Sequence, residues 1–105
     1  MSGARIGVDI GGTKVDAVVL GEDDRVVARH RIPVRRGPDG VVSSALQAVA
    51  EACATAGIAP GDATCVGVGV PGAVVGGVVR HALNLDVDEL DLATALADAW
   101  RVRVT

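Results

Sequence analysis

Asp9-Ile10-Gly11-Gly12-Thr13-Lys14 is the stretch of this sequence that decides the fold. It lies between two apolar segments rich in β-branched residues, 5–8 and 15–20, and therefore predicts a tight turn between two strands. Gly11 and Gly12 carry no Cβ, so the backbone can take unusual dihedral angles and its N–H groups can approach an anion closely. The stretch predicts a hairpin that binds phosphate.

Three side chains of the same stretch support this interpretation. Thr13 adds a hydroxyl and Lys14 a positive charge, while Asp9 offers an oxygen ligand suited to the hydrated Mg²⁺ that accompanies nucleotide phosphates. The spacing is not that of a Walker A loop, and the following residues predict a strand rather than a helix. An ordinary hairpin is the alternative, because Gly-Gly between alternating apolar residues is a turn signal in any protein.

The composition limits the classes of protein to consider. The chain has 105 residues, enough for one domain or part of one, and half of them are apolar, yet it has one Trp and no Phe or Tyr. A core of Val, Ala, Leu and Ile suits a sheet covered by helices. The net charge of −3, the scattered basic residues and the lack of aromatic platforms argue against nucleic-acid binding. No apolar run reaches the length of a membrane span and Asp9 interrupts any signal sequence, so we expect a cytoplasmic protein with no membrane partner.

The cysteines and histidines do not form a metal-binding pattern. Cys53 and Cys65 stand alone in apolar surroundings, which favours reduced core cysteines over a disulfide. His30 is expected on the surface of a sheet and His81 in a solvated loop together with Arg80.

The first half of the chain predicts three antiparallel strands and a helix. Strands are expected over residues 4–9, 14–20 and 26–32, the last ending at Pro33. A helix follows, with apolar positions spaced by three and four between residues 42 and 56. Asp39 is its expected N-cap and Gly57 its C-terminal glycine.

The second half predicts a central strand, a hairpin, a helix and the start of a last strand. Residues 64–70 form the strand, in which Gly67 and Gly69 leave one face without side chains, and Pro71-Gly72 ends it. A small hairpin over 74–79 precedes an irregular segment, 80–85. The second helix is expected to start at Asp91 and run to Trp100, with Leu92, Leu96 and Trp100 on its apolar stripe, and residues 102–105 begin another strand.

This order of elements is a three-strand antiparallel meander followed by β-α-β units, which place the later strands parallel to the first. Ligands of open α/β sheets bind beyond the strand ends. The phosphate turn and Pro71-Gly72 are therefore expected at related edges of the sheet.

Three motifs in this order resemble the N-terminal part of the ROK family of repressors, open reading frames and sugar kinases, and its bacterial glucokinases in particular. They are Asp9-Ile-Gly-Gly-Thr-Lys14, Gly67-Val-Gly-Val-Pro-Gly72 and Asn84-Leu85. The resemblance extends over essentially the whole chain, 1–105. It implies the actin-like ATPase fold, which is ribonuclease-H-like, in which two such domains close on ATP and sugar.

The resemblance also implies roles for individual residues. Residues Asp9, Gly11, Gly12, Thr13 and Lys14 match the motif that faces the ATP phosphates, with Asp9 near Mg²⁺. Gly72 matches a position where the backbone lies against the hexose, and Asn84 an asparagine that hydrogen-bonds sugar hydroxyls. An amide suits adjacent hydroxyls because it offers two donors and an acceptor; without the resemblance, an ordinary loop or cap residue would be the favoured interpretation of Asn84.

The family's catalytic aspartate, its cysteine-rich zinc motif and its adenine-binding half would follow Thr105. We therefore expect no catalytic base within these residues, no hexokinase activity from them alone, and zinc only in the part that follows. The implied activity of the full-length protein is ATP-dependent phosphorylation of a hexose, most simply glucose to glucose 6-phosphate in glycolysis, by a dimer or tetramer. The alternatives are a sugar-sensing transcriptional regulator of the same family and a non-catalytic actin-like ATPase.

Overall fold

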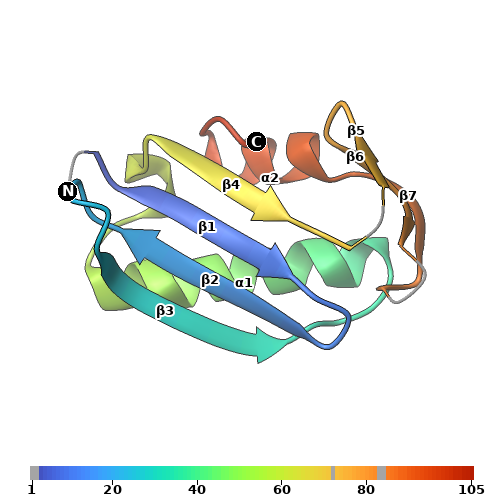
Figure 1. Cartoon of the computed structure of the whole chain (residues 1–105), viewed down its shortest axis with the longest axis horizontal. Coiled ribbons are helices and arrows are strands. Elements are labelled where there is room, and N and C mark those ends of the chain that lie inside the picture. Colours follow the sequence, from blue (N-terminus) through green and yellow to red (C-terminus); the bar gives the residue numbers. More distant parts are fainter. Residues whose placement is uncertain (1–2, 72, 83–84) are drawn as a thin grey trace.

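The main sheet has four strands, and its centre is the pair that flanks the predicted phosphate turn (Figure 1). A computed structural model describes residues 3–71, 73–82 and 85–105. Strands β1 (Arg5–Ile10), β2 (Lys14–Leu20) and β3 (Val26–Pro33) are antiparallel neighbours, and β4 (Cys65–Gly69) runs parallel to β1 on its other side. The predicted meander and the parallel strand that follows it are both confirmed.

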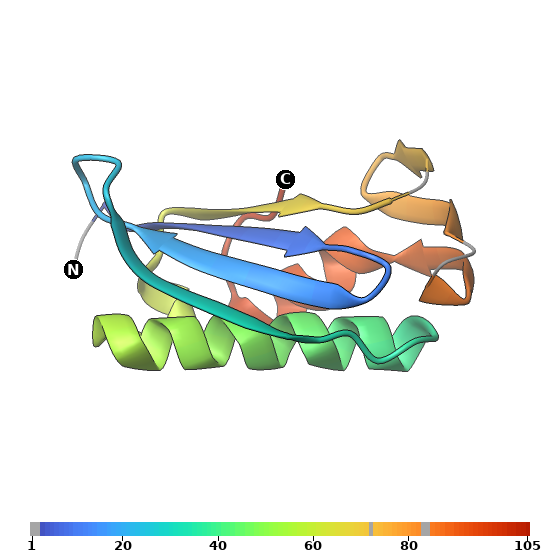
Figure 2. The ribbon, with the colours of Figure 1, turned by 60° about the horizontal axis from the view of Figure 1, so that its bottom comes forward.

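Helix α1 (Pro38–Ala56) covers one face of this sheet (Figure 2). Its buried side is made largely of small side chains, which allow the helix to lie close to the strands. The fully buried alanines on this side are Ala45, Ala48 and Ala52. They pack with buried strand residues such as Val15, Ala17 and Val19 in a single core.

The two ends of α1 differ in how well the sequence predicted them. Asp39 is not the N-cap, because the helix begins one residue earlier at Pro38, and the cap position is Gly37 with no side-chain hydrogen bond. Proline is favoured at the first helical position because its φ is fixed near the helical value. At the other end, Gly57 adopts the left-handed conformation at the C-cap, as predicted.

A second, smaller sheet is formed by residues that the sequence predicted only in part. It consists of β5 (Ala73–Val75), β6 (Val78–Ala82) and β7 (Val87–Asp91), in the order β5-β6-β7 and antiparallel throughout. The prediction of an irregular segment over 80–85 is wrong for residues 80–82, which belong to β6. Arg80 is a strand residue rather than a loop residue, and its guanidinium pairs with Glu89 of β7 at 2.6 Å.

A short 3₁₀ turn (Pro60–Asp62) precedes β4. After the smaller sheet, the chain forms a second helix and then returns to the main sheet. Helix α2 (Leu92–Trp100) is capped by Asp91, whose Oδ1 accepts from the Thr94 N–H at 3.3 Å. The predicted stripe is confirmed, since Leu92, Leu96 and Trp100 are all buried. Residues 103–105 then pair with β4 on the edge that β1 leaves free, through a parallel bridge between Val66 and Val104. No helix within the described residues is long and apolar enough to cross a membrane.

Both cysteines are free thiols, in agreement with the prediction from the sequence. Cys53 is buried on α1, whereas Cys65 is half-buried on β4. Burial raises the pKa of the Cys53 thiol above its ordinary value, and the negative charge of Asp62 raises it further. The side chain therefore stays neutral in the folded protein at a pH where an exposed thiol ionises.

This raised pKa predicts a loss of stability in alkaline solution. Below a pH of about 8.5 the thiol is protonated in both the folded and the unfolded states, so it does not make the free energy of unfolding depend on pH. Above that pH the unfolded state releases the proton and the folded state does not, so the free energy of unfolding falls as the pH rises. Denaturant unfolding between pH 7 and 10 should show a steeper fall for the wild type than for Cys53→Ala; parallel curves would contradict the assignment.

Candidate functional site

The phosphate turn connects β1 to β2 and is held by backbone hydrogen bonds at both of its sides. The Gly11 N–H donates to the Lys14 carbonyl at 2.8 Å, and the Val34 N–H donates to the Thr13 carbonyl at 3.0 Å. Gly12, Thr13 and Lys14 are exposed to solvent. The turn is therefore fixed by its main chain while its hydroxyl and ammonium groups remain available to a ligand.

Neither Gly11 nor Gly12 has a positive φ, so the expected need for unusual dihedral angles is not what the structure displays. At Gly11, glycine is needed because the turn leaves too little space for a side chain. A Cβ on this residue would lie 3.3 Å from the Lys14 carbonyl oxygen, closer than an ordinary contact. Glycine thus allows the turn to close tightly.

Asp9 lies on the face of the sheet opposite α1, beside the turn. It is exposed and stands directly across from Asp16 on β2 and Gly69 on β4. A Cβ on Gly69 would be 3.5 Å from Asp9 Oδ1, so any larger side chain there would extend over the carboxylate. Glycine at this position leaves Asp9 open to solvent and ligands.

A groove of about 360 Å³ runs along this face of the sheet. Glycines account for much of its floor, as the alternation in residues 64–70 had indicated. The lining residues are Gly7, Val8, Asp9, Asp16, Val18, Arg29, Gly67, Val68 and Gly69. The groove therefore offers a ligand a space that is rich in main chain and bordered by charged side chains.

The sequence analysis missed the charged side chains that accompany Asp9. Asp16 is paired with Arg31 at 3.0 Å and with Arg29 at 3.5 Å, and only 18% of its side chain is exposed. The two arginines offset the repulsion between the neighbouring carboxylates of Asp9 and Asp16, since like charges across a strand pair are destabilising. The period-two alternation along β2 and β3 was the signal that could have placed these residues on one face.

The carboxylate of Asp9 suits Mg²⁺ better than it suits a metal ion whose ligands all come from the protein. Mg²⁺ keeps several waters and is usually bound by one or two carboxylates together with substrate phosphates. Asp9, exposed next to the phosphate turn, offers such a carboxylate. Within residues 3–71, 73–82 and 85–105, no group of three or more His, Cys, Asp and Glu side chains is arranged to hold a metal by itself.

The two residues predicted to contact sugar, Gly72 and Asn84, lie outside the described residues. Of their chain neighbours, Pro71, Ala73 and Leu85 are described. Pro71 follows β4, which ends at the same edge of the sheet as the parallel β1. Leu85, directly after Asn84, is buried with 1% of its surface exposed. Their roles remain predictions.

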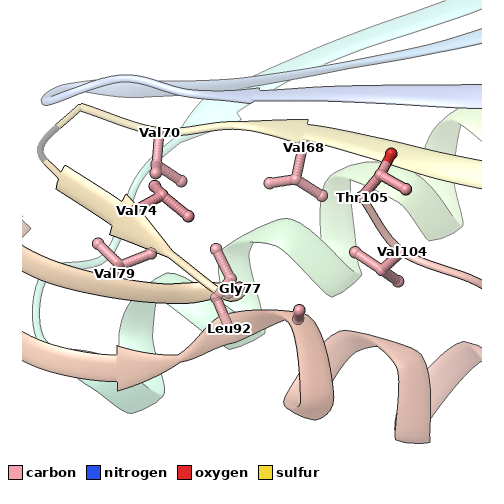
Figure 3. A pocket seen from close by; sticks show the side chains of 9 residues that line it. Val68, Val70, Val74, Gly77, Val79, Leu92, Val104 and Thr105 are labelled. Atoms are coloured by element: carbon pink, nitrogen blue, oxygen red, sulfur yellow. The ribbon is translucent and has the colours of Figure 1, made fainter.

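A second hollow of about 50 Å³ lies between β4, the smaller sheet and α2 (Figure 3). Its walls are apolar and are built mostly from valines. Val68, Val70, Val74, Val79 and Leu92 point toward it from these elements (Figure 3). Among the described residues, its lining contains no charged side chain and Thr105 supplies its one hydroxyl, so this hollow offers no chemistry comparable to that of the groove beside Asp9.

Comparison with known protein families matches residues 5–105 to the ROK family. The chain belongs to this family. Its structure is similar to that of a ROK family glucokinase from Streptomyces griseus in complex with glucose and AMPPNP, with a TM-score of 0.85 and 31% identity over 98% of this chain and 32% of that one. The ROK hexokinase from Thermus thermophilus is also similar, with a TM-score of 0.84 and 27% identity over 96% of this chain and 33% of that one. The actin-like ATPase fold of these ROK kinases is thus the fold of this chain.

Two further proteins are similar to this chain. The glucokinase of Streptomyces coelicolor is 40% identical over 47 residues, which are 45% of this chain and 15% of that protein. A ROK transcriptional regulator, a homologue of the E. coli MLC protein, shares the fold with a TM-score of 0.83 at 19% identity, over 99% of this chain and 27% of that one. The chain spans about a third or less of the length of these ROK proteins.

Proposed function

We propose that the complete gene product containing this chain is an ATP-dependent hexose kinase that converts glucose to glucose 6-phosphate. One observation carries this proposal: an open carboxylate, Asp9, lies beside a main-chain turn that exposes Thr13 and Lys14. The similarity to kinases of the ROK family, one of them in complex with glucose and AMPPNP, supports it.

Each residue of the site has a role in this proposal. The backbone of Gly11 and Gly12 and the side chains of Thr13 and Lys14 would hold the ATP phosphates, and Asp9 would hold Mg²⁺ through its coordinated waters. When bound, Mg²⁺ neutralises charge on the phosphates. Phosphoryl transfer depends chiefly on such positioning and neutralisation, so a rigid turn beside an open carboxylate suits this reaction.

The sugar would bind at the same edge of the sheet. The backbone at Gly72, after β4, and the amide of Asn84, before Leu85, would contact its hydroxyls. We place the base that accepts the proton of the sugar hydroxyl outside these 105 residues, together with the adenine-binding half. The protein is expected to act in the cytoplasm as a homo-oligomer.

A sugar-sensing regulator is the second candidate function, because a ROK transcriptional regulator shares this fold. The two candidates differ in the use made of the phosphate turn. A kinase requires Asp9 and Lys14 for turnover, whereas a sensor requires only the sugar segment.

A coupled assay of ATP-dependent phosphorylation separates these candidates. The complete gene product is assayed with glucose, mannose, fructose and N-acetyl sugars, and sugar binding is measured in parallel by calorimetry. Turnover that is strongest with glucose would support the proposal, and a preference for another sugar would correct its substrate. Sugar binding without turnover on any of the sugars would favour the regulator.

Asn84→Ala is expected to weaken glucose binding about tenfold or more, because one or two hydrogen bonds worth about 1 kcal/mol each would be lost and their partners left unpaired. The dissociation constant from calorimetry measures this effect. Thr55→Ala is a suitable control, because it truncates an exposed polar side chain in the last turn of α1, at the end opposite to Gly37. Unchanged glucose affinity in Asn84→Ala would remove this residue from the sugar site.

A further inference from the structure

Four residues between β3 and α1 connect the phosphate turn to the segment that carries Asn84. We call residues 34–37 the strap. At its first residue the Val34 N–H donates to the Thr13 carbonyl at 3.0 Å, and at its last the Gly37 N–H donates to the Leu85 carbonyl at 2.7 Å. The turn, the start of α1 and β7 accordingly gather at one end of the molecule (Figures 1 and 2).

The strap is also fixed to the first turns of α1. The Arg35 N–H donates to Ser44 Oγ at 2.8 Å, and this buried hydroxyl donates in turn to the Gly40 carbonyl at 2.7 Å. The Arg35 guanidinium donates to Ser43 Oγ and to Gln47 Oε1. Three successive attachments, to the turn, to α1 and to Leu85, therefore leave the strap little freedom to move independently of its neighbours.

Gly37 has a backbone conformation that other residues avoid. Its φ of 86° and ψ of 161° lie in a region that is essentially restricted to glycine. A Cβ at this position would meet nothing within 4 Å, so the restriction comes from the backbone and not from crowding. In this conformation Gly37 makes two hydrogen bonds at once, from its N–H to Leu85 and from the Val41 N–H to its own carbonyl at 2.8 Å.

We infer that Gly37 is a positioning residue for the sugar site. It holds the Leu85 carbonyl, and with it the chain next to Asn84, in a fixed relation to the phosphate turn, so that the groups that bind the sugar are already in place when the sugar arrives. Misplacing a binding group by about 1 Å is enough to reduce an enzyme's efficiency strongly. This inference rests on the proposed function, because it assigns the sugar to the segment that Leu85 follows.

The test compares Gly37→Ala with Gly57→Ala in the complete gene product. Gly57 is a matched control at the opposite end of α1, since it also has a positive φ, of 78°, and open space around its missing Cβ. Both variants should unfold at a lower temperature than the wild type. Only Gly37→Ala should raise the KM and the dissociation constant for glucose, by about tenfold, while kcat and the KM for ATP stay within about threefold, because the strain is relieved by moving the strap and losing the bond to Leu85.

Several results would overturn this role. A glucose dissociation constant within twofold of the wild-type value in Gly37→Ala would make the strap a purely structural element, as would equal losses of glucose affinity in both variants. Failure of the proposed function gives a different result. A wild type that binds glucose without phosphorylating it would end the kinase proposal, and the dissociation constants of the variants would still decide on the strap. A wild type that binds no sugar would end both.

Discussion

Replacing Asp9 by Asn should lower the turnover of the complete gene product by about a hundredfold or more, because the proposed reaction would lose the charge that would hold Mg²⁺ beside the transferred phosphate. The substitution keeps the size of the side chain, and Asp9 is exposed, so the fold should tolerate it. Glucose binding should change by less than about threefold, since the proposal assigns the carboxylate to the phosphate side of the site. The coupled kinase assay measures the first effect and calorimetry with glucose measures the second.

Asp23→Asn is the matched control for this prediction. Asp23 lies in the turn between β2 and β3, at the opposite end of the meander, where its exposed carboxylate pairs with Arg25 at 3.3 Å. Such an exposed pair contributes little to stability, so turnover should stay within about twofold of the wild type. A variant of Asp9 that kept more than a third of the wild-type turnover would show that this carboxylate has no central part in the reaction.

Replacing Ile10 by Ala should lower the free energy of unfolding by about 2–5 kcal/mol, the usual cost of removing a buried isoleucine side chain beyond Cβ. Ile10 is 1% exposed and is the last residue of β1, directly before the phosphate turn. The cavity left below Gly11 should also allow the turn to shift, so turnover should fall even at temperatures where the protein stays folded. Denaturant unfolding and the kinase assay at 15 °C measure the two effects.

The comparison for Ile10 is Ile58→Ala, which shortens a half-buried isoleucine just after α1. Ile58→Ala should lower the free energy of unfolding by roughly half as much or less, because part of the Ile58 side chain is already in contact with water. If the two variants lost the same stability, Ile10 would not be the central core residue that its burial indicates.

Local sequence patterns predicted the elements whose structure depends mainly on their own residues. The three strands of the meander, the spacing of three and four in α1, Gly57 at its end and the stripe of α2 were all confirmed. The smaller sheet was predicted less well. Residues 86–91 contain four acidic side chains, which are unfavourable in strands, and β7 forms because the chain pairs with β6 while Val87 is buried and Leu90 half-buried.

In the candidate site, too, the features that depend on neighbouring residues were predicted better than those that depend on distant ones. The turn after Asp9 could be predicted because its chemistry is contained in six consecutive residues. The alternation could place Asp16, Arg29 and Arg31 on one face, but their pairing depends on the register of β2 against β3, and a shift by one residue would place one strand's side chains on the other face. The contact of Gly37 with Leu85 joins residues almost fifty positions apart and has no local signal.

The parallel pairing of β1 with β4 has a consequence for the order of folding. Each residue of β1 meets its β2 partner across a short hairpin, but Arg5 meets Cys65 only after a loop of about sixty residues has closed. Contacts of such long range form slowly, and a chain that leaves the ribosome from its N-terminus exposes the meander well before β4. We therefore expect the phosphate turn to form early in synthesis, and the wall of the groove that contains Gly69 to be added only in a late step.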